Sequence, residues 1–379
     1  MKKIITNGTI ILKDGLMKQN ILIDGDTIVG FTTDIPEGYE VIDAMGHYVA
    51  PGFVDVHTHG RNAFDTMDGI YEAIDTISVN CMKTGVTSVL PTTMTQSIPL
   101  TKRAIQNCVD YMGHENGAKI AGVHMEGPFI EVKKKGAQPG EYVLAPSIEQ
   151  FEEMVNGNHQ AIALITVAPE VVGMPSFIHY LNNLGITVSM GHTNANYEEA
   201  KAGFREGITH STHTYNAMNG FTHREPGAVG AIFDSDDVYA ELILDGIHVH
   251  FAAAKTLIKE KGIGKVCLIT DSMEAAGLHE GKYQLGGQGV YVKNGEARLA
   301  DGTLAGSVLN MNVAVKNAYQ KLHLPIYEAV RMASYNPAMS INRHEIGEIA
   351  PNKKADLLVI NDNIDILKVL IDGEEKYTA

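Results

Sequence analysis

Short runs of β-branched and apolar residues alternate with longer segments of helical periodicity through most of this chain. The runs predict strands and the segments between them predict helices. Eight strands that alternate with helices in this way indicate an α/β protein, a (β/α)8 barrel of the TIM type. The predicted strands are residues 53–57, 86–91, 120–124, 162–167, 187–190, 209–213, 239–244 and 266–270.

A doubly wound open sheet is the alternative for the same alternation of strands and helices. That fold carries a glycine-rich phosphate-binding turn after its first strand, and none follows residue 57. The glycines at 286, 287 and 289 lie between two strand-like stretches instead. We therefore expect a hairpin insertion near residues 281–303 within a barrel that spans residues 52–344.

Both ends of the chain are rich in strand-forming residues and turn dipeptides. Asp14-Gly15, Asp24-Gly25 and Asp372-Gly373 are typical of tight turns between strands. Neither end is long enough to bury a core alone. We expect residues 1–51 and 345–379 to pair into one small β-sandwich domain.

Charge and cysteine content exclude several partners. Thirty basic and forty-five acidic side chains give a net charge of −15, which argues against nucleic acid or an anionic membrane as the partner. Cys81, Cys108 and Cys267 are dispersed, as in reduced proteins, and no apolar run reaches the length of a membrane helix. The expected location is the cytoplasm.

Possible metal ligands stand at the ends of the predicted strands. The active site of a (β/α)8 barrel lies at the carboxyl ends of its strands, so side chains placed there share one rim. Histidines scattered through a core would not select this end of several strands. The side chains that do so are His57, His59, Glu126, His192, His213 and Asp271.

The spacing and types of these residues indicate a metal centre. His57 and His59 are two residues apart, so an extended strand directs both imidazoles to one face. Imidazole with carboxylate suits zinc, iron, manganese or cobalt, and does not suit calcium. A bound metal acidifies water and polarises a carbonyl group, and Asp271 would then act as the general base.

Seven segments, in chain order, resemble the N-acetylglucosamine-6-phosphate deacetylase family of the amidohydrolase superfamily. The resemblance implies hydrolysis of the N-acetyl group of N-acetylglucosamine 6-phosphate, giving glucosamine 6-phosphate and acetate, in amino-sugar catabolism and cell-wall sugar recycling. It also implies a homodimer. The segments that carry it are residues 51–60 (PGFVDVHTHG), 124–129 (HMEGPF), 191–195 (GHTNA), 212–218 (THTYNAM), 245–249 (DGIHV), 270–273 (TDSM) and 304–307 (LAGS).

The resemblance also implies a role for each matching position. Glu126, His192 and His213 match the principal metal site, and His57 and His59 match a second site that Glu126 bridges, so one or two ions are possible. Asp271 matches the catalytic acid and base. The positions that match substrate-binding residues are Ala137, Asn216, Ala217, His248, Leu304, Ala305, Gly306 and Arg224, which would reach the phosphate from the neighbouring subunit.

Two positions and two alternative functions stay open at this point. Some relatives carry histidine where Gln138 stands, which leaves a side-chain contact from this position in doubt, and His124 is expected behind the ligands rather than among them. Another amidohydrolase, acting on a cyclic amide or a nucleobase, often bridges its metals with a carboxylated lysine, and residues 162–170 contain none. A non-catalytic scaffold barrel would have lost ligands, whereas this chain keeps all of them. The choice between N-acetylglucosamine and N-acetylgalactosamine phosphates also stays open.

Overall fold

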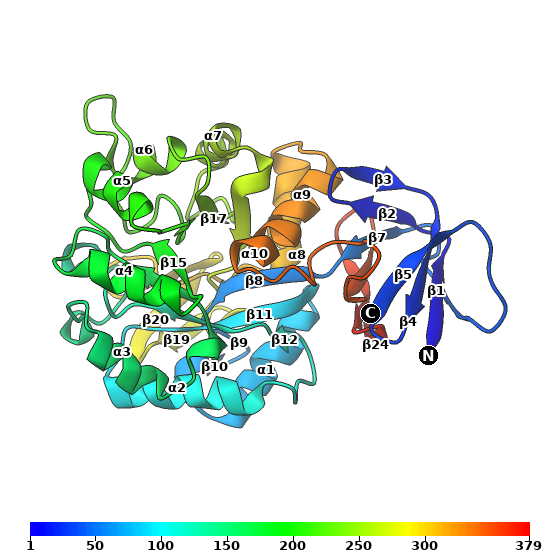
Figure 1. Ribbon diagram of the computed structural model, residues 1–379, viewed down its shortest axis with the longest axis horizontal. Helices are drawn as coiled ribbons and strands as arrows, with labels where there is room; N and C mark the ends of the chain where they lie inside the picture. Colours follow the sequence, from blue (N-terminus) through cyan, green and yellow to red (C-terminus); the bar gives the residue numbers. More distant parts are fainter.

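The structure, a computed structural model that describes residues 1–379, consists of a barrel and a smaller β domain that contains both termini (Figure 1). Strands and helices alternate through the barrel, and separate sheets form the small domain. The expected fold class, a (β/α)8 barrel with a small β domain from both chain ends, is confirmed.

Eight parallel strand positions form the barrel wall. β8 pairs with β11, and the sheet continues through β13 to β18 in chain order. The barrel closes where the Asp271 amide donates to the His57 carbonyl oxygen at 2.8 Å and the His59 amide donates to Ser272 at 2.8 Å. The strands are β8 (Phe53–Thr58), β11 (Val86–Thr93), β12 (Lys119–Ile120), β13 (Val123–Glu126), β14 (Ile162–Val167), β15 (Thr187–Met190), β16 (His210–Ser211), β17 (Tyr239–Ile243) and β18 (Val266–Ile269).

Two predicted strands are wrong in extent. The predicted strand 120–124 is divided into β12 and β13 at Gly122, whose φ of 147° interrupts regular pairing. The predicted strand 209–213 shrinks to β16, because the backbone of His213 turns into the left-handed region, with φ at 30°. Both departures come from backbone conformation at a single residue, which apolar patterning does not report.

Helices cover the outside of the barrel, and local sequence accounts for several of their ends. The Ser147 side chain accepts a hydrogen bond from Gln150 at the start of α3, and Asn196 with Glu199 forms a capping box at α5. No helix of the structure combines the length and apolar character needed to span a membrane. The helices are α1 (Tyr71–Met82), α2 (Ile98–Tyr111), α3 (Ile148–Val155), α4 (Met174–Asn183), α5 (Tyr197–Arg205), α6 (Gly227–Phe233), α7 (Phe251–Lys261), α8 (Met311–Lys316), α9 (Ile326–Ala333) and α10 (Tyr335–Ser340).

The small domain packs two sheets around an apolar core. The sheet orders are β5-β4-β1-β6 and β24-β23-β22-β7-β2-β3, so β7 from the first part of the chain pairs with β22 from its last part. The strands of this domain that come before the barrel are β1 (Lys2–Thr6), β2 (Thr9–Leu12), β3 (Gly15–Met17), β4 (Asn20–Asp24), β5 (Thr27–Thr32), β6 (Glu40–Asp43) and β7 (Tyr48–Pro51), and those that come after it are β22 (Leu357–Ile360), β23 (Ile366–Ile371) and β24 (Glu374–Thr378). Helices α8 to α10 lie on the side of the barrel that faces the small domain (Figure 1).

A three-stranded antiparallel sheet follows β18. It consists of β19 (Gly281–Leu285), β20 (Gln288–Lys293) and β21 (Glu296–Arg298), within the range expected for a hairpin insertion. Leu285, Val290 and Ala297 bury their side chains against Met94 and Met273 of the barrel. This packing fixes the insertion beside the barrel rim.

Candidate active site

Glu126 lies at the centre of the predicted ligands. It ends β13, and its Oε1 atom lies 3.0 Å from Nε2 of His192 and 3.0 Å from Nε2 of His213. The same Oε1 atom is 3.6 Å from Nε2 of His57, and Oε2 is 3.3 Å from Nε2 of His59. One carboxylate therefore contacts four imidazoles that come from three different parts of the barrel rim.

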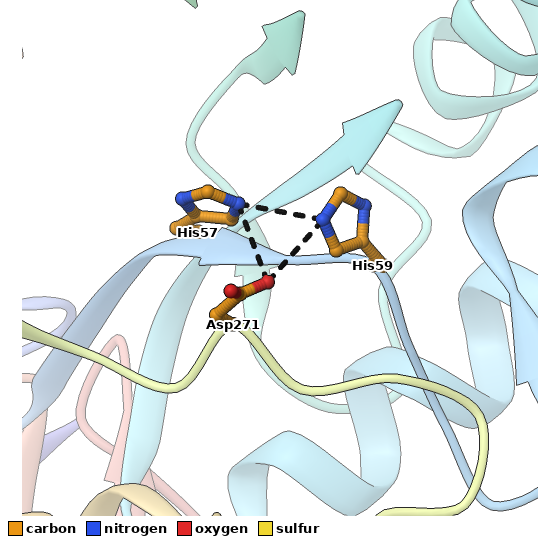
Figure 2. Close-up of side chains that lie close together, drawn as sticks. All are labelled: His57, His59 and Asp271. Atoms are coloured by element: carbon orange, nitrogen blue, oxygen red, sulfur yellow. Dashed lines mark hydrogen bonds and ion pairs between the residues drawn. The ribbon is translucent and has the colours of Figure 1, made fainter. Parts of the chain in front are cut away.

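Asp271 completes a second group with the two histidines of β8 (Figure 2). Its Oδ1 atom lies 3.5 Å from Nε2 of His57 and 3.3 Å from Nε2 of His59. Asp271 lies two residues after the end of β18, which neighbours β8 where the barrel closes. The six predicted ligand and catalytic side chains are thus brought together, all of them buried.

Hydrogen bonds at the outer ring nitrogens orient three of the four histidines. Nδ1 of His57 faces a carboxylate oxygen of Glu241 at 3.0 Å, Nδ1 of His59 faces the Thr92 carbonyl at 3.2 Å, and Nδ1 of His192 faces the Lys134 carbonyl at 2.9 Å. Because these partners only accept, each Nδ1 carries the proton, and the lone pair of each neutral imidazole is on Nε2. All three lone pairs point to the centre.

This arrangement fits a divalent cation. Nitrogen lone pairs and carboxylate oxygens converge at 3.0–3.6 Å, where neither kind of atom can donate a hydrogen bond to the other. Two groups, Glu126–His192–His213 and His57–His59–Asp271, each keep their ligand atoms within 4.8 Å of one another. Imidazole with carboxylate is the donor set of zinc, iron, manganese or cobalt.

Without a cation, the cluster has to bind protons instead. Burial works to lower the pKa of His57, but the carboxylates of Asp271, Glu241 and Glu126 outweigh burial and raise it to about 9. Burial works to raise the pKa of Glu126, and the surrounding imidazoles hold it well below its usual range. Metal binding to this cluster would therefore release protons.

The backbone at the rim adopts conformations that side chains rarely take. His192, His213 and Asp271 have φ values of 45°, 30° and 49°, all in the left-handed region. Non-glycine residues occupy this region at a cost, and such residues concentrate at functional sites. Here the turn at the end of each strand directs the following side chain into the centre of the rim.

His248 is oriented by the carboxylate of Asp245. Oδ2 of Asp245 lies 2.6 Å from Nδ1 of His248, and Oδ1 accepts hydrogen bonds from the amides of Ile247 and His248 at 2.8 Å each. The acceptor-only carboxylate places the Nδ1 proton between the two side chains. Nε2 of His248 is therefore left for a ligand in the adjacent cavity.

The cavity above the cluster has a volume of about 340 Å³ and contains most of the expected substrate-binding residues. Ala305 does not line it, because its side chain packs in the apolar cluster with Met94 and Met273. Arg224 does not line it either, and lies exposed in the loop before α6. The expected residues that do line it are Ala137, Asn216, Ala217, His248, Leu304 and Gly306.

Gln138 occupies the cavity wall beside the carboxylate of Glu126. Its Nε2 atom donates to Oε2 of Glu126, and its Oε1 atom accepts from the amide of Thr95 at 2.7 Å. The side chain is buried, at 2% exposed. Gln138 therefore helps to fix the orientation of the Glu126 carboxylate through Oε2, the oxygen that also faces His59.

Sequence reasoning missed Glu241, which lies inside the barrel below the cluster beside His124, the histidine that was expected behind the ligands. Glu241 is fully buried on β17 and contacts His57. His124 donates from Nδ1 to the Val56 carbonyl, its Nε2 contacts Oγ1 of Thr166, and its ring packs edge-on against His57 at 4.6 Å. A signal for Glu241 was present, since it is a charged residue inside the apolar run 239–244. A carboxylate on a strand that is buried on both faces requires a partner.

Comparison with known proteins agrees with this geometry. The profile of the amidohydrolase family matches residues 48–376. The N-acetylglucosamine-6-phosphate deacetylase of Lysinibacillus sphaericus is 36% identical over 86% of this chain and 85% of its own. The N-acetylgalactosamine-6-phosphate deacetylase of Escherichia coli O157:H7 is 30% identical over 99% of both chains. A crystal structure of N-acetylglucosamine-6-phosphate deacetylase from Pasteurella multocida, 31% identical, superposes over the full length of both chains with a TM-score of 0.95. The chain belongs to the amidohydrolase family, in the group that includes the N-acetylglucosamine-6-phosphate deacetylases.

Proposed function

We propose that this chain hydrolyses the acetamide of N-acetylglucosamine 6-phosphate, giving glucosamine 6-phosphate and acetate. The observation that carries the proposal is the convergence of Glu126, His192, His213 and Asp271 beneath one cavity, which is lined by residues that the sequence resemblance predicts to bind substrate. The identity of the relatives supports the substrate. The absence of lysine at the end of β14 argues against a cyclic-amide hydrolase built around a carboxylated lysine.

In the proposed reaction, water adds to the acetamide carbonyl carbon and the bond from that carbon to nitrogen breaks. A bound metal would supply Lewis-acid chemistry, since it acidifies water and polarises a carbonyl oxygen. Asp271 accepts the proton of the attacking water and delivers it to the leaving nitrogen, so that acetate and the free amine result. Burial favours a raised pKa for Asp271, but His57 and His59 hold its pKa below the ordinary value, which keeps the carboxylate ionised.

His248 would hydrogen-bond the substrate from the wall of the cavity. Its side chain is only 6% exposed, and Asp245 fixes the ring so that Nε2 remains available. Leu304 and Gly306 line the same cavity, in the positions that match the N-acetyl pocket of the group. These contacts would hold the acetamide beside Asp271.

We propose zinc or iron as the metal, with manganese or cobalt as further possibilities, and one or two ions per subunit. Glu126, His192 and His213 would hold the principal ion, and His57 and His59 would hold a second one with Glu126 shared. Mixed nitrogen and oxygen donors support all four metals. Metal analysis of the purified protein decides identity and number.

We also propose a homodimer in which Arg224 of one subunit binds the phosphate in the other subunit's cavity. Asn216 and Ala217 line the cavity, and a chain segment at this position can offer backbone N–H groups to phosphate. Arg224 is exposed and absent from the cavity of its own chain, which leaves its guanidinium free for a neighbour. A guanidinium fork suits phosphate oxygens.

We place the reaction in the cytoplasm. All three cysteines are buried and unpaired, as in proteins of reducing compartments. The proposed substrate is a charged sugar phosphate, and the proposed reaction belongs to amino-sugar catabolism and cell-wall sugar recycling.

The test is acetate release from N-acetylglucosamine 6-phosphate, measured with and without a chelator. We expect turnover that is lost on chelation and restored by zinc or iron. N-acetylgalactosamine 6-phosphate and a dihydropyrimidine serve as comparison substrates. Preference for the galactose epimer would revise the substrate. If metal-loaded protein releases acetate from neither sugar phosphate, the proposal is wrong.

A further inference from the structure

Glu241 is a buried carboxylate on a strand that contributes no ligand to the cluster. It lies in β17, and its side chain is 0% exposed inside the barrel. A single oxygen, Oε2, accepts from Nδ1 of His57 at 3.0 Å and from the backbone amide of His213 at 2.9 Å. His57 belongs to one of the two ligand groups and His213 to the other.

The burial of this carboxylate has a large cost unless it makes charge-assisted hydrogen bonds. Its other oxygen, Oε1, has no hydrogen-bond partner, and the nearest basic atom, Nδ1 of His210, is 3.6 Å away. The favourable contacts of Glu241 are therefore concentrated on the two ligand-bearing residues. An apolar residue would satisfy the packing of β17 at lower cost, so the carboxylate needs an explanation outside the core.

We propose that Glu241 is a positioning residue that holds His57 with its Nε2 lone pair toward the metal and fixes the His213 turn at the same time. The inference rests on the proposed metal site. With an acceptor-only partner at Nδ1, His57 carries its proton there, and only Nε2 is left to bind a cation. The bond to the His213 amide holds the strained backbone turn that aims the His213 side chain at Glu126.

A third metal site at Glu241 is the competing interpretation. His57, His124 and Glu241 also keep their ligand atoms within 4.8 Å. Both nitrogens of His124 are already occupied, since Nδ1 contacts the Val56 carbonyl at 3.1 Å and Nε2 contacts Oγ1 of Thr166 at 2.8 Å. His57 cannot give Nδ1 to a cation while this atom donates to Glu241. The contacts favour a hydrogen-bonded support over an ion at this position.

Two substitutions separate the shape of the carboxylate from its charge. In Glu241→Gln, an amide oxygen at the Oε2 position can still accept from both His57 and His213, while the negative charge is lost. In Glu241→Leu, both hydrogen bonds are lost at similar volume. Asp356→Asn is the matched control, because it neutralises another buried carboxylate, 4% exposed, that contacts Lys119 and not the cluster.

The experiment measures metal per subunit after dialysis, the affinity for cobalt followed by its visible spectrum, and the thermal midpoint. We expect Glu241→Leu to weaken metal binding by about 10- to 100-fold, the range found when the hydrogen-bond partner of a ligand is removed. Glu241→Gln should fall between Glu241→Leu and the unchanged protein. Asp356→Asn should bind metal normally whatever its thermal midpoint.

A double-mutant cycle with His57→Gln shows whether Glu241 acts through His57. If it does, Glu241→Gln should weaken metal binding much less in the His57→Gln background than alone. Full additivity, or normal metal binding by folded Glu241→Leu, would overturn the inference. Cobalt binding is read without substrate, so a wrong substrate proposal would leave this result intact. If Glu241→Leu does not fold, Glu241→Gln and the cycle still decide.

Discussion

The barrel rim and the small β domain distribute polar groups in opposite ways. The core of the small domain consists of thirteen buried residues, all of them Ile, Leu, Val or Ala, most of them on its paired strands. The rim buries four histidines and two carboxylates in direct contact, and three of these residues have left-handed backbone conformations. The difference indicates that the small domain contributes mainly to stability, whereas the rim keeps strained backbone conformations and buried polar groups that the proposed reaction requires.

The largest effect that separates the two regions should come from Asp271→Asn. We expect a rate at least ~10²-fold lower, the scale of a removed general base, with little change in the thermal midpoint. Acetate release measures the rate, thermal unfolding measures the midpoint, and metal analysis verifies that the remaining ligand residues still bind metal. Near-normal turnover would contradict the assignment of Asp271.

Leu357→Ala in the small domain should have the opposite pattern, with lower stability and unchanged catalysis. Leu357 is 0% exposed in β22 and packs in the apolar core, so truncation should lower the free energy of unfolding by about 2–5 kcal/mol. We expect kcat per folded molecule to stay unchanged. Urea unfolding and kinetics at a temperature where the variant remains folded give the two values. A fall in kcat under those conditions would show that the small domain also sets the geometry of the rim.

The sequence predicted the small domain and the ligands for different reasons. Alternating apolar residues report burial, which is why pairing of the two chain ends was foreseeable, and the rule that barrel sites lie at strand ends located Glu126 and Asp271. The sequence could not reveal the hydrogen bond between His57 and Glu241. The two residues are 184 positions apart, and the contact depends on where each side chain points inside the closed barrel. The side-chain direction of Ala305 could not be predicted for the same reason, since it depends on a local turn whether this side chain faces the cavity or the apolar cluster.

A smaller effect should follow from Asp245→Asn, which changes a residue that acts on the rim through His248. An amide can present an N–H group to Nδ1 of His248 and so reverse the tautomer that the carboxylate fixes. We expect kcat/KM to fall by roughly 10-fold, with normal metal content, as for loss of a supporting hydrogen bond. Steady-state kinetics check this. In a His248→Asn background the same substitution should have almost no further effect, and an undiminished loss there would exclude action through His248.

The smallest effect concerns the contact between the small domain and the barrel, at the end of the barrel away from the rim. Nζ of Lys119, in β12 of the barrel, lies 2.9 Å from Asp356 and 2.8 Å from Asp372, beside strands of the small domain. Burial works to lower the pKa of Lys119, but the two carboxylates outweigh burial and raise it. A raised lysine pKa stabilises the fold at pH values below the unfolded pKa of ~10.4, and this stabilisation is lost as pH rises through the folded pKa.

Lys119→Met should therefore lower the free energy of unfolding by about 1 kcal/mol at pH 8, because the pair is partly exposed to solvent. The difference between the unchanged protein and the variant should shrink as pH rises from the unfolded pKa of ~10.4 through the raised folded pKa of Lys119. Urea unfolding at pH 8 and pH 11 measures it, with the exposed Lys18→Met as a control for general lysine titration. A difference that stays constant with pH would mean that the aliphatic part of Lys119, and not its charge, joins the barrel to the small domain.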